Sequence, residues 1–355
     1  MCRSYEHSVE NEMGTAESEG MSMIVKAWAP NRILDFGGWT DTWFAKHGAV
    51  LNFAVDLYAR VVVRTRARPG VSITASDYGE TIEMTSIDSI IYDGEHDLLK
   101  AAVKVMGLDQ IDLQVHSDVP PGCGTGSSAA VSVAMLGALG TLAGRYQRPH
   151  EVARLAHQLE TKELGIESGV QDQIAAAVGG IGYHDIYDYP FVSSTPVRLA
   201  SSIIWELESR LIVVYTGARH LSSDVHRKVV GDLQAGRAEA ISAMEALRQT
   251  PQKAADALWR GDFDAFADVM NENNAAQAKL HDDIVTPDLA RIEEVARAAG
   301  AIGFKINGAG GGGSGTLLCR AGARRDVETA LKEAGYQVLN CHLDTQGLRV
   351  WVSQP

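Results

Sequence analysis

The sequence predicts an α+β protein of two domains, and three observations carry this prediction. The chain has 355 residues, a length that favours two domains over one. From residue 211 onward, the predicted elements follow the order strand, helix, strand, strand, helix, strand, which is that of a ferredoxin-like domain. The first half mixes β-rich segments with helices, and it contains a glycine-punctuated loop that runs directly into a helix of small residues.

The first half is predicted to combine strands and helices along its whole length. Segments rich in β-branched and alternating apolar residues predict strands at 24–28, 54–64, 71–74, 81–84 and 111–115. Helical spacing of apolar residues predicts helices at 96–106, 127–143, 149–163 and 171–178. The helix over 127–143 is rich in alanine and contains two glycines, so we expect it to pack closely on all sides.

A polar stretch at 183–196, rich in Tyr, Asp, Pro and Ser, is predicted to link the two domains. We therefore expect an N-terminal domain over 23–195 and a C-terminal domain over 196–355. The second domain should begin with a strand at 211–215, followed by amphipathic helices to about residue 299. Its remaining strands and helix are predicted at 301–306, 315–319, 324–334, 336–341 and 348–352.

Composition argues against several classes of function. The net charge of -13 at pH 7 opposes a nucleic-acid partner, and no apolar run is long enough to span a membrane. The four cysteines have no CxxC spacing and the 11 histidines no metal-ligand spacing, so we expect reduced thiols in a cytoplasmic protein. Residues 1–22 are acidic and lack the basic start and apolar core of a signal peptide, which predicts a disordered tail. A monomer and a homodimer both remain open.

The most informative segment is the glycine loop at 119–130, whose sequence is VPPGCGTGSSAA. Glycines let backbone N–H groups approach a ligand closely because no Cβ stands in the way. The helix that begins near Ser127 adds its free N–H groups and the positive end of its dipole. Together these features predict an anion site, most often for phosphate. The loop lacks the Gly-Lys-Ser/Thr ending of a P-loop.

Two other segments combine glycines with polar residues. A second glycine run covers 308–315, and the segment 29–42 places an arginine, Gly37-Gly38 and Asp41 directly after a predicted strand. Open backbone at the two glycines and a carboxylate at Asp41 could hold a ligand that carries hydroxyl groups. Taken alone, the segment is better explained as a turn with a surface carboxylate.

Two carboxylates are candidates for chemistry. Asp172 stands between two glutamines at a predicted helix start, where it either caps the helix or accepts a proton from a bound hydroxyl. Glu160, on the preceding helix, is either a solvated surface residue or, beside a phosphate loop, a ligand of Mg²⁺ together with a serine hydroxyl.

Taken together, these segments resemble the GHMP kinase family, which includes galactokinase and the homoserine, mevalonate and phosphomevalonate kinases. Residues 29–41, 120–130 and 305–313 look like the three motifs of that family, in the same order. The resemblance implies an N-terminal domain like that of ribosomal protein S5, a ferredoxin-like C-terminal domain, and an active site in the cleft between them. It also implies ATP and Mg²⁺ as cofactors and a small molecule as the partner.

The resemblance implies roles residue by residue. Asp172 would be the catalytic carboxylate, and Arg32 would stabilise its charge and the transferring phosphoryl group. Glu160 and Ser128, with Ser127 as the alternative serine, would hold Mg²⁺. The ATP phosphates would contact Pro121, Gly122, Gly124, Gly126, Ser127, Ser128 and Ala129. The acceptor would contact Gly37, Gly38, Trp39, Thr40, Asp41, Gln171, Arg219, Gly310 and Gly311.

The first motif also bears on the acceptor. Galactokinases carry Gly-Glu-His-Thr-Asp there, whereas this chain has Gly-Gly-Trp-Thr-Asp at 37–41, which is similar to the branch of heptose-phosphate kinases and fucokinases. That branch phosphorylates an anomeric hydroxyl, and the chain length favours a heptose 7-phosphate as acceptor. Trp43 and Phe44 depart from that branch, which usually has prolines there. The basic segment with Arg219, His220, Arg227 and Lys228 would bind the sugar phosphate or, equally well, form a solvated helix face.

Two alternatives stay open. The first is a kinase of a free sugar that resembles fucose, galactose or arabinose. The second belongs to another class: a catalytically silent regulator that binds ATP and sugar. The presence of Arg32, Ser128, Glu160 and Asp172 opposes the second alternative, because a silent relative is expected to lose at least one of them.

Overall fold

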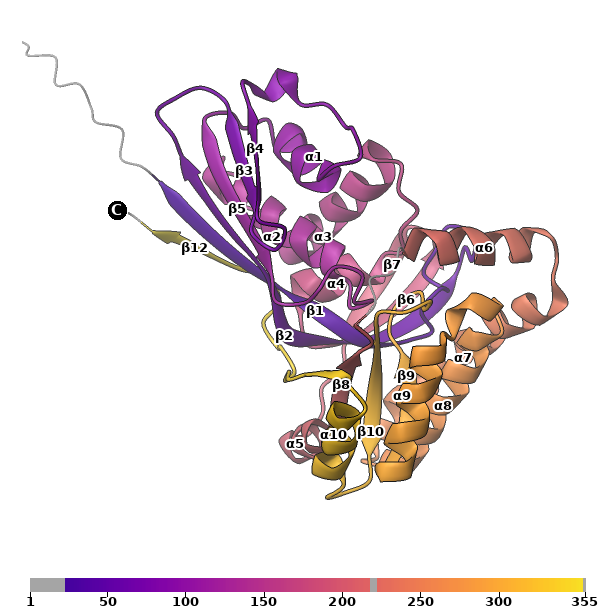
Figure 1. Cartoon of the computed structure of the whole chain (residues 1–355). Helices are drawn as coiled ribbons and strands as arrows, with labels where there is room; N and C mark the ends of the chain where they lie inside the picture. The colour runs from indigo at the N-terminus through magenta and orange to yellow at the C-terminus, as the bar shows by residue number, and fades with distance from the viewer. Residues whose placement is uncertain (1–22, 218–221, 354–355) are drawn as a thin grey trace, which may run out of the picture.

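The structure is a computed structural model that describes residues 23–217 and 222–353. It contains two sheets, each with its own set of helices, which meet along the lower edge of the first sheet in Figure 1. The predicted tail at 1–22 and the predicted substrate residue Arg219, with His220 beside it, lie outside the described residues. In the described ranges, no helix combines the length and the apolar character that a membrane span requires.

The first sheet has eight strands and is organised by two long ones, β1 (Ile24–Phe36) and β2 (Gly48–Thr65). Its main order is β12-β1-β2-β5-β3-β4. Strand β2 pairs with β5 along residues 59–65 and with β6 along residues 48–53, so the sheet forks along its length. The shorter strands are β3 (Val71–Ala75), β4 (Glu80–Met84), β5 (Ile111–Ser117), β6 (Ile181–Asp188), β7 (Phe191–Pro196) and β12 (Arg349–Ser353).

Helix α2 (Ser127–Leu142) lies at the centre of the first layer of helices and packs on β1, β2 and three other helices. Its positions from Ala129 to Gly140 are buried almost without exception, which confirms the expected close packing. A Cβ at Gly137 would lie 2.8 Å from Leu348 Cδ2, so this glycine allows the chain leading into β12 to approach the helix. The other helices of this layer are α1 (Asp97–Met106), α3 (Pro149–Gln158), its π-helical continuation Leu159–Glu163, and α4 (Gln171–Val178).

The second sheet has four antiparallel strands in the order β11-β8-β10-β9. The first and fourth strands of this unit, β8 (Leu211–Tyr215) and β11 (Gln337–Leu339), are neighbours, and β10 (Ser314–Cys319) lies between β8 and β9 (Ala301–Ile306). This arrangement confirms the ferredoxin-like prediction. The helices of this half are α5 (Ser201–Arg210), α6 (Ser222–Gln234), α7 (Ala238–Trp259), α8 (Phe263–Ala278), α9 (Pro287–Ala299) and α10 (Arg324–Glu333).

Two sequence predictions about domain organisation are wrong. The stretch 183–196 is not a link, because β6 and β7 form a hairpin there that belongs to the first sheet. In β6, the buried His184 and Ile186 alternate with the exposed Asp185 and Tyr187. The last strand, β12, pairs with β1 and not with the second sheet, so the chain ends in the first domain. There Trp351 packs edge-on against Trp28, at 5.1 Å between ring centroids.

Candidate active site

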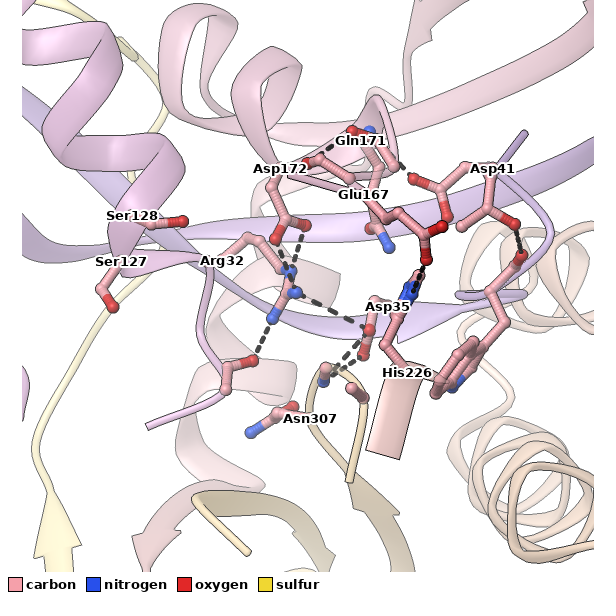
Figure 2. A pocket seen from close by; sticks show the side chains of 18 of the residues that line it. Arg32, Asp35, Asp41, Ser127, Ser128, Glu167, Gln171, Asp172, His226 and Asn307 are labelled. Carbon is pink, nitrogen blue, oxygen red and sulfur yellow. Dashed lines mark hydrogen bonds and ion pairs between the residues drawn. The ribbon is translucent and has the colours of Figure 1, made fainter. Parts of the chain in front are cut away.

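The two halves of the molecule enclose a cavity of about 370 Å³ (Figure 2). Its walls come from β1 and the turn after it, the loop before α2, the segment 160–172, helix α6, and the glycine run after β9. A second cavity of about 640 Å³ adjoins it and shares Gly122, Ser127 and Ser128 with it. The site therefore has two chambers, with the glycine loop between them.

An arginine–carboxylate pair stands in the wall of the first cavity. Arg32 Nε lies 2.8 Å from Asp172 Oδ1, and Arg32 Nη2 lies 2.9 Å from Asp172 Oδ2. The third guanidinium nitrogen donates to the carbonyl of Gly124 in the glycine loop. Burial would lower the pKa of Arg32, but the carboxylates of Asp172 and Asp35 raise it above its ordinary value, so the side chain is charged. Asp172 keeps 26% of its side chain exposed, on the cavity side.

The glycine loop has the shape that its sequence predicts. Gly122, Gly124 and Gly126 all have positive φ, and α2 begins directly after them at Ser127. A Cβ at Gly124 would lie 2.7 Å from the carbonyl oxygen of Asn307, so this position has room only for glycine. Ser127 and Ser128 line both cavities. Of the other predicted phosphate contacts, Pro121 lines the second cavity, and Ala129 is buried and lines neither.

The second glycine run packs directly on the first. A Cβ at Gly308 would lie 2.7 Å from the carbonyl oxygen of Gly124, so the two loops touch. Gly308, Gly310 and Gly312 line the main cavity. Gly311 does not: its N–H donates to the carbonyl of Ile284 at 2.8 Å, and it lines a separate cavity. That cavity also contains Lys228, which is paired with Asp283.

Glu160 lies in the π-helical turn and is almost fully buried, with 4% exposure. Its Oε2 accepts a hydrogen bond from Gln173 Nε2 at 2.9 Å, whereas its buried Oε1 has no partner among the described residues. Burial, together with the nearby charge of Asp172, raises the pKa of Glu160 to about 7. The hydroxyls of Ser168 and Ser128 lie close enough to act on the same carboxyl group. This carboxylate is therefore available to a cation in the cavity.

Asp41 lies at the opposite end of the cavity from the glycine loop. Its Oδ2 accepts hydrogen bonds from the N–H groups of Val170 at 2.9 Å and Gln171 at 3.1 Å, at the N-terminus of α4. Burial and the charge of Asp172 raise its pKa to about 6, while the hydrogen bond from Gln171 opposes that shift. Asp41 and Gln171 line the cavity together, as the motif resemblance implied.

Three of the other predicted acceptor contacts belong to the same turn as Asp41 but do not line the cavity. These are Gly37, Gly38 and Thr40. The N–H of Gly37 donates to Asn273 Oδ1, and a Cβ there would lie 2.2 Å from the carbonyl oxygen of Ala49. Thr40 is buried and donates to the carbonyl of Gly37. These residues shape the turn, so the backbone at the glycine pair is not open to a ligand as the sequence suggested.

Trp39 does line the cavity, and it does so from a strained backbone. Its φ is 81°, a conformation that bulky residues rarely adopt and that costs about 1–3 kcal/mol. The indole is 5% exposed, and its Nε1 has no hydrogen-bond partner among the described residues. A buried donor without a partner in a cavity wall is suited to receive a polar group of a ligand.

His226 and Glu167 are cavity residues that the sequence did not indicate. The imidazole of His226, on α6, stacks on Trp39 at 4.8 Å between centroids and points toward Glu167, as Figure 2 shows. His226 Nδ1 lies 3.6 Å from Glu167 Oε2, and burial lowers the pKa of the histidine. Neither residue lies in one of the three motifs. Their contact joins a helix of the second half to a loop of the first, and a contact between such distant segments leaves no local signal in the sequence.

Comparisons with known proteins identify relatives along most of the chain. Two family models match it: GHMP kinases N terminal domain over residues 97–180 and GHMP kinases C terminal over residues 243–337. The D-glycero-alpha-D-manno-heptose 7-phosphate kinase of Campylobacter jejuni is 28% identical over 337 residues, which cover 92% of this chain and 98% of that protein. The mevalonate kinase of Pyrococcus horikoshii is 30% identical over 280 residues, which cover 78% of this chain and 77% of that one.

A solved structure agrees with these relatives. The crystal structure of a D-glycero-D-manno-heptose 1-phosphate kinase from Bacteriodes thetaiotaomicron matches with a TM-score of 0.77 and 26% identity. The match covers 92% of this chain and 98% of that one, so the two molecules share both domains and their connection.

Proposed function

We propose that this chain, which belongs to the GHMP kinase family and is a phosphotransferase with an alcohol group as acceptor, phosphorylates the anomeric hydroxyl of a heptose 7-phosphate with ATP. One observation carries the proposal: Asp172, held at two points by Arg32, faces the cavity between the glycine loop and Asp41. A carboxylate fixed between a phosphate site and a site for hydroxyl groups is placed to act on a hydroxyl that attacks a phosphoryl group.

The nucleotide is assigned to the glycine loop and the chamber behind it. The 640 Å³ cavity adjoins the N-terminus of α2 and has room for a nucleoside. With the base there, the phosphates would pass over Gly122, Ser127 and Ser128 into the smaller cavity, where the helix dipole favours negative charge. The terminal phosphoryl group would then face Asp172 and Arg32.

The residues near this path fit Mg²⁺. The unpaired, buried Oε1 of Glu160 and the hydroxyl of Ser128 are hard oxygen donors, and Mg²⁺ commonly takes one or two protein oxygens together with phosphates and water. Glu160 and Ser128 would hold the ion. Bound there, Mg²⁺ would neutralise charge on the phosphates.

The chain's own groups then divide the chemistry. Asp172 orients the attacking hydroxyl and accepts its proton at a carboxylate oxygen. Arg32 keeps Asp172 in place and offers positive charge beside the transferring group. Because the transition state of phosphoryl transfer is loose, the positions of these groups matter more than the basicity of Asp172.

The acceptor is assigned to the other end of the cavity. Asp41 offers a carboxylate, Trp39 an unpaired indole N–H and His226 an imidazole, which together suit a molecule with several hydroxyls. Burial lowers the pKa of His226, so its ring is neutral at pH 7 and can accept or donate one hydrogen bond. The names of the Campylobacter and Bacteriodes relatives support a heptose as this molecule.

A free sugar is the second candidate, and the charge of the cavity favours it. Among the described lining residues, five are acidic, whereas Arg32 and His226 are the basic ones. Arg32 is already engaged by Asp172, and Lys228 lies in a separate cavity. A sugar phosphate would therefore need a basic group that does not line the described cavity, such as Arg219 or His220, which lie outside the described residues, or Arg227.

A substrate panel tests the proposal. We would measure ATP consumption with heptose 7-phosphate, mannose 6-phosphate and free heptose, fucose, galactose and arabinose, and locate the new phosphate by phosphorus NMR. Asp172→Asn serves as the blank, and Asp268→Asn, an exposed carboxylate on α8, as the matched control.

Each outcome decides between the candidates. Turnover of heptose 7-phosphate with phosphate at the anomeric carbon supports the proposal. Turnover restricted to a free sugar selects the second candidate. No turnover of any compound, with ATP still bound, would instead favour the silent regulator.

A further inference from the structure

A second buried ion pair lies directly behind the catalytic one. Lys305 Nζ, on β9, is 2.6 Å from Asp35 Oδ1, on β1, and both side chains are 3% exposed or less. Lys305 also donates to the carbonyl of Ile306 at 2.8 Å. Burying two charges is costly unless each is well paired, so this pair persists only because its geometry compensates for the lost water. The phosphoryl-transfer scheme above does not use it.

Asp35 connects three parts of the site. Besides Lys305, its carboxylate accepts the N–H of Gly308 at 3.1 Å, at the start of the second glycine run. Its Oδ2 lies 3.9 Å from Arg32 Nη2, which makes Asp35 the second carboxylate within reach of the catalytic arginine (Figure 2). Asp35 therefore touches the C-terminal domain and the catalytic pair at the same time.

Four charges alternate in sign from the interior to the cavity: Lys305, Asp35 and Arg32, which are buried, and then Asp172, which is partly exposed. In this arrangement, Lys305 neutralises the charge of Asp35. Arg32 is therefore free to form its ion pair with Asp172. Without the lysine, Asp35 would become a buried carboxylate whose nearest cation is Arg32, and Coulomb attraction is strong where water is excluded. Arg32 would then turn from Asp172 toward Asp35.

We infer that Asp35 and Lys305 form an interdomain positioning pair, which commits Arg32 to Asp172 and makes the catalytic geometry depend on the docking of β9. Neither residue needs to touch the reacting atoms. Asp35 also accepts the N–H of Gly308, which packs on Gly124, so the pair lies beside the contact between the two glycine loops. The inference rests on phosphoryl transfer by Asp172 and not on which sugar accepts.

A double-mutant cycle tests this inference with the full-length protein. Lys305→Met should lower kcat by about 100-fold, since displacing a catalytic group by about 1 Å costs that much, while KM for ATP and for the sugar changes less than about threefold. Asp35→Asn alone should lower kcat by about tenfold, because the buried lysine then repels Arg32. The double variant removes both charges and should recover at least about tenfold over Lys305→Met.

A matched variant of another ion pair separates a specific effect of the Asp35–Lys305 pair from the loss of a lysine in general. Lys253→Met is the matched control: it breaks a lysine–carboxylate pair of the same 2.6 Å length, to Glu272, between exposed positions of α7 and α8. Its kcat should stay within twofold of wild type.

Two results would overturn the inference. One is a Lys305→Met protein that keeps its kcat. The other is a double variant no better than Lys305→Met, which would mean that the pair only supports packing. Should Lys305→Met fail to fold, Asp35→Asn and the double variant still decide, because the inference requires the double variant to be at least as active as Asp35→Asn.

Discussion

The two ends of the reaction cavity are built in different ways. At the phosphate end, the walls are backbone: glycines with positive φ, the start of α2, and a second glycine run in contact with the first. At the acceptor end, the walls are side chains, with Asp41 and Trp39 from one turn, Glu167 from a loop and His226 from α6.

This difference predicts that the two ends contribute differently to substrate specificity. A backbone wall offers N–H groups and a helix dipole, which suit any phosphate and depend on glycine at a few positions. A side-chain wall can be changed one residue at a time without disturbing the strand or helix that carries it. We therefore expect substitutions at the phosphate end to abolish turnover and those at the acceptor end to change the substrate preference.

The largest expected effect lies where the two ends meet, at Asp172. Asp172→Asn keeps the shape of the side chain but removes its charge and its ability to accept a proton. We expect kcat to fall by about 1000-fold, while the Kd for ATP from calorimetric titration stays within about threefold. Asp268→Asn should retain wild-type kcat. A fully active Asp172→Asn enzyme would contradict the assigned role.

The phosphate end can be tested at its tightest contact. Gly124→Ala would force a Cβ to within 2.7 Å of the Asn307 carbonyl, whereas Gly144→Ala has a similar positive φ with nothing within 4 Å. Both should lose about 1–2 kcal/mol of folding free energy in denaturant titrations, because left-handed backbone is unfavourable for alanine. Only Gly124→Ala should also lose activity, by about 100-fold. Equal activity losses would show that backbone strain, and not the contact between the loops, is responsible.

The acceptor end should respond to pH through Asp41. Because its pKa is raised to about 6, the Asp41 carboxylate, which we propose binds the sugar hydroxyls, is protonated below that pH. We expect KM for the sugar to rise toward about tenfold per pH unit below pH 6. Asp41→Asn should remove this dependence. An unchanged acid limb in that variant would assign the limb to another group.

The raised pKa of Asp41 affects folding stability in the opposite direction from sugar binding. Protonation of Asp41 is expected to weaken sugar binding, but it stabilises the ligand-free fold. The folded pKa of Asp41, about 6, exceeds its ordinary value of 3.8, so the ligand-free fold gains stability from this group below pH 3.8 and loses it as the pH rises to 6. Asp41→Asn should therefore raise the melting temperature at pH 8, measured without ligands, even though it weakens sugar binding.

The smallest expected effect concerns His226. His226→Ala removes one hydrogen-bonding group and the stacking partner of Trp39, and we expect KM for the sugar to rise about three- to tenfold with little change in kcat. His342→Gln removes an imidazole that is 68% exposed and lies away from the cavity, so it should behave as wild type. A selective change in KM for ATP would mean that α6 contacts the nucleotide instead.

The glycine loop was largely predictable from the sequence because its signals are local. Glycines at 122, 124 and 126 followed by a small-residue helix define the backbone conformation of the loop within a few residues. The ferredoxin-like fold of the second half was also predictable, because the order of its strands and helices can be read from local sequence patterns. The predicted link failed because a hairpin and a loop can have the same turn-rich composition, and only pairing with β2 distinguishes them.

By itself, the sequence determined the two-domain α+β class and the glycine loop before α2, and it indicated the candidates Arg32, Asp172, Glu160 and Asp41. Only the tertiary structure decided which distant segments are in contact. It stacks His226 on Trp39, pairs Lys305 with Asp35, and places β12 in the first sheet. Backbone conformation depends on nearby residues, whereas buried charges and stacked rings find their partners from distant segments, and those pairings form only when the domains dock.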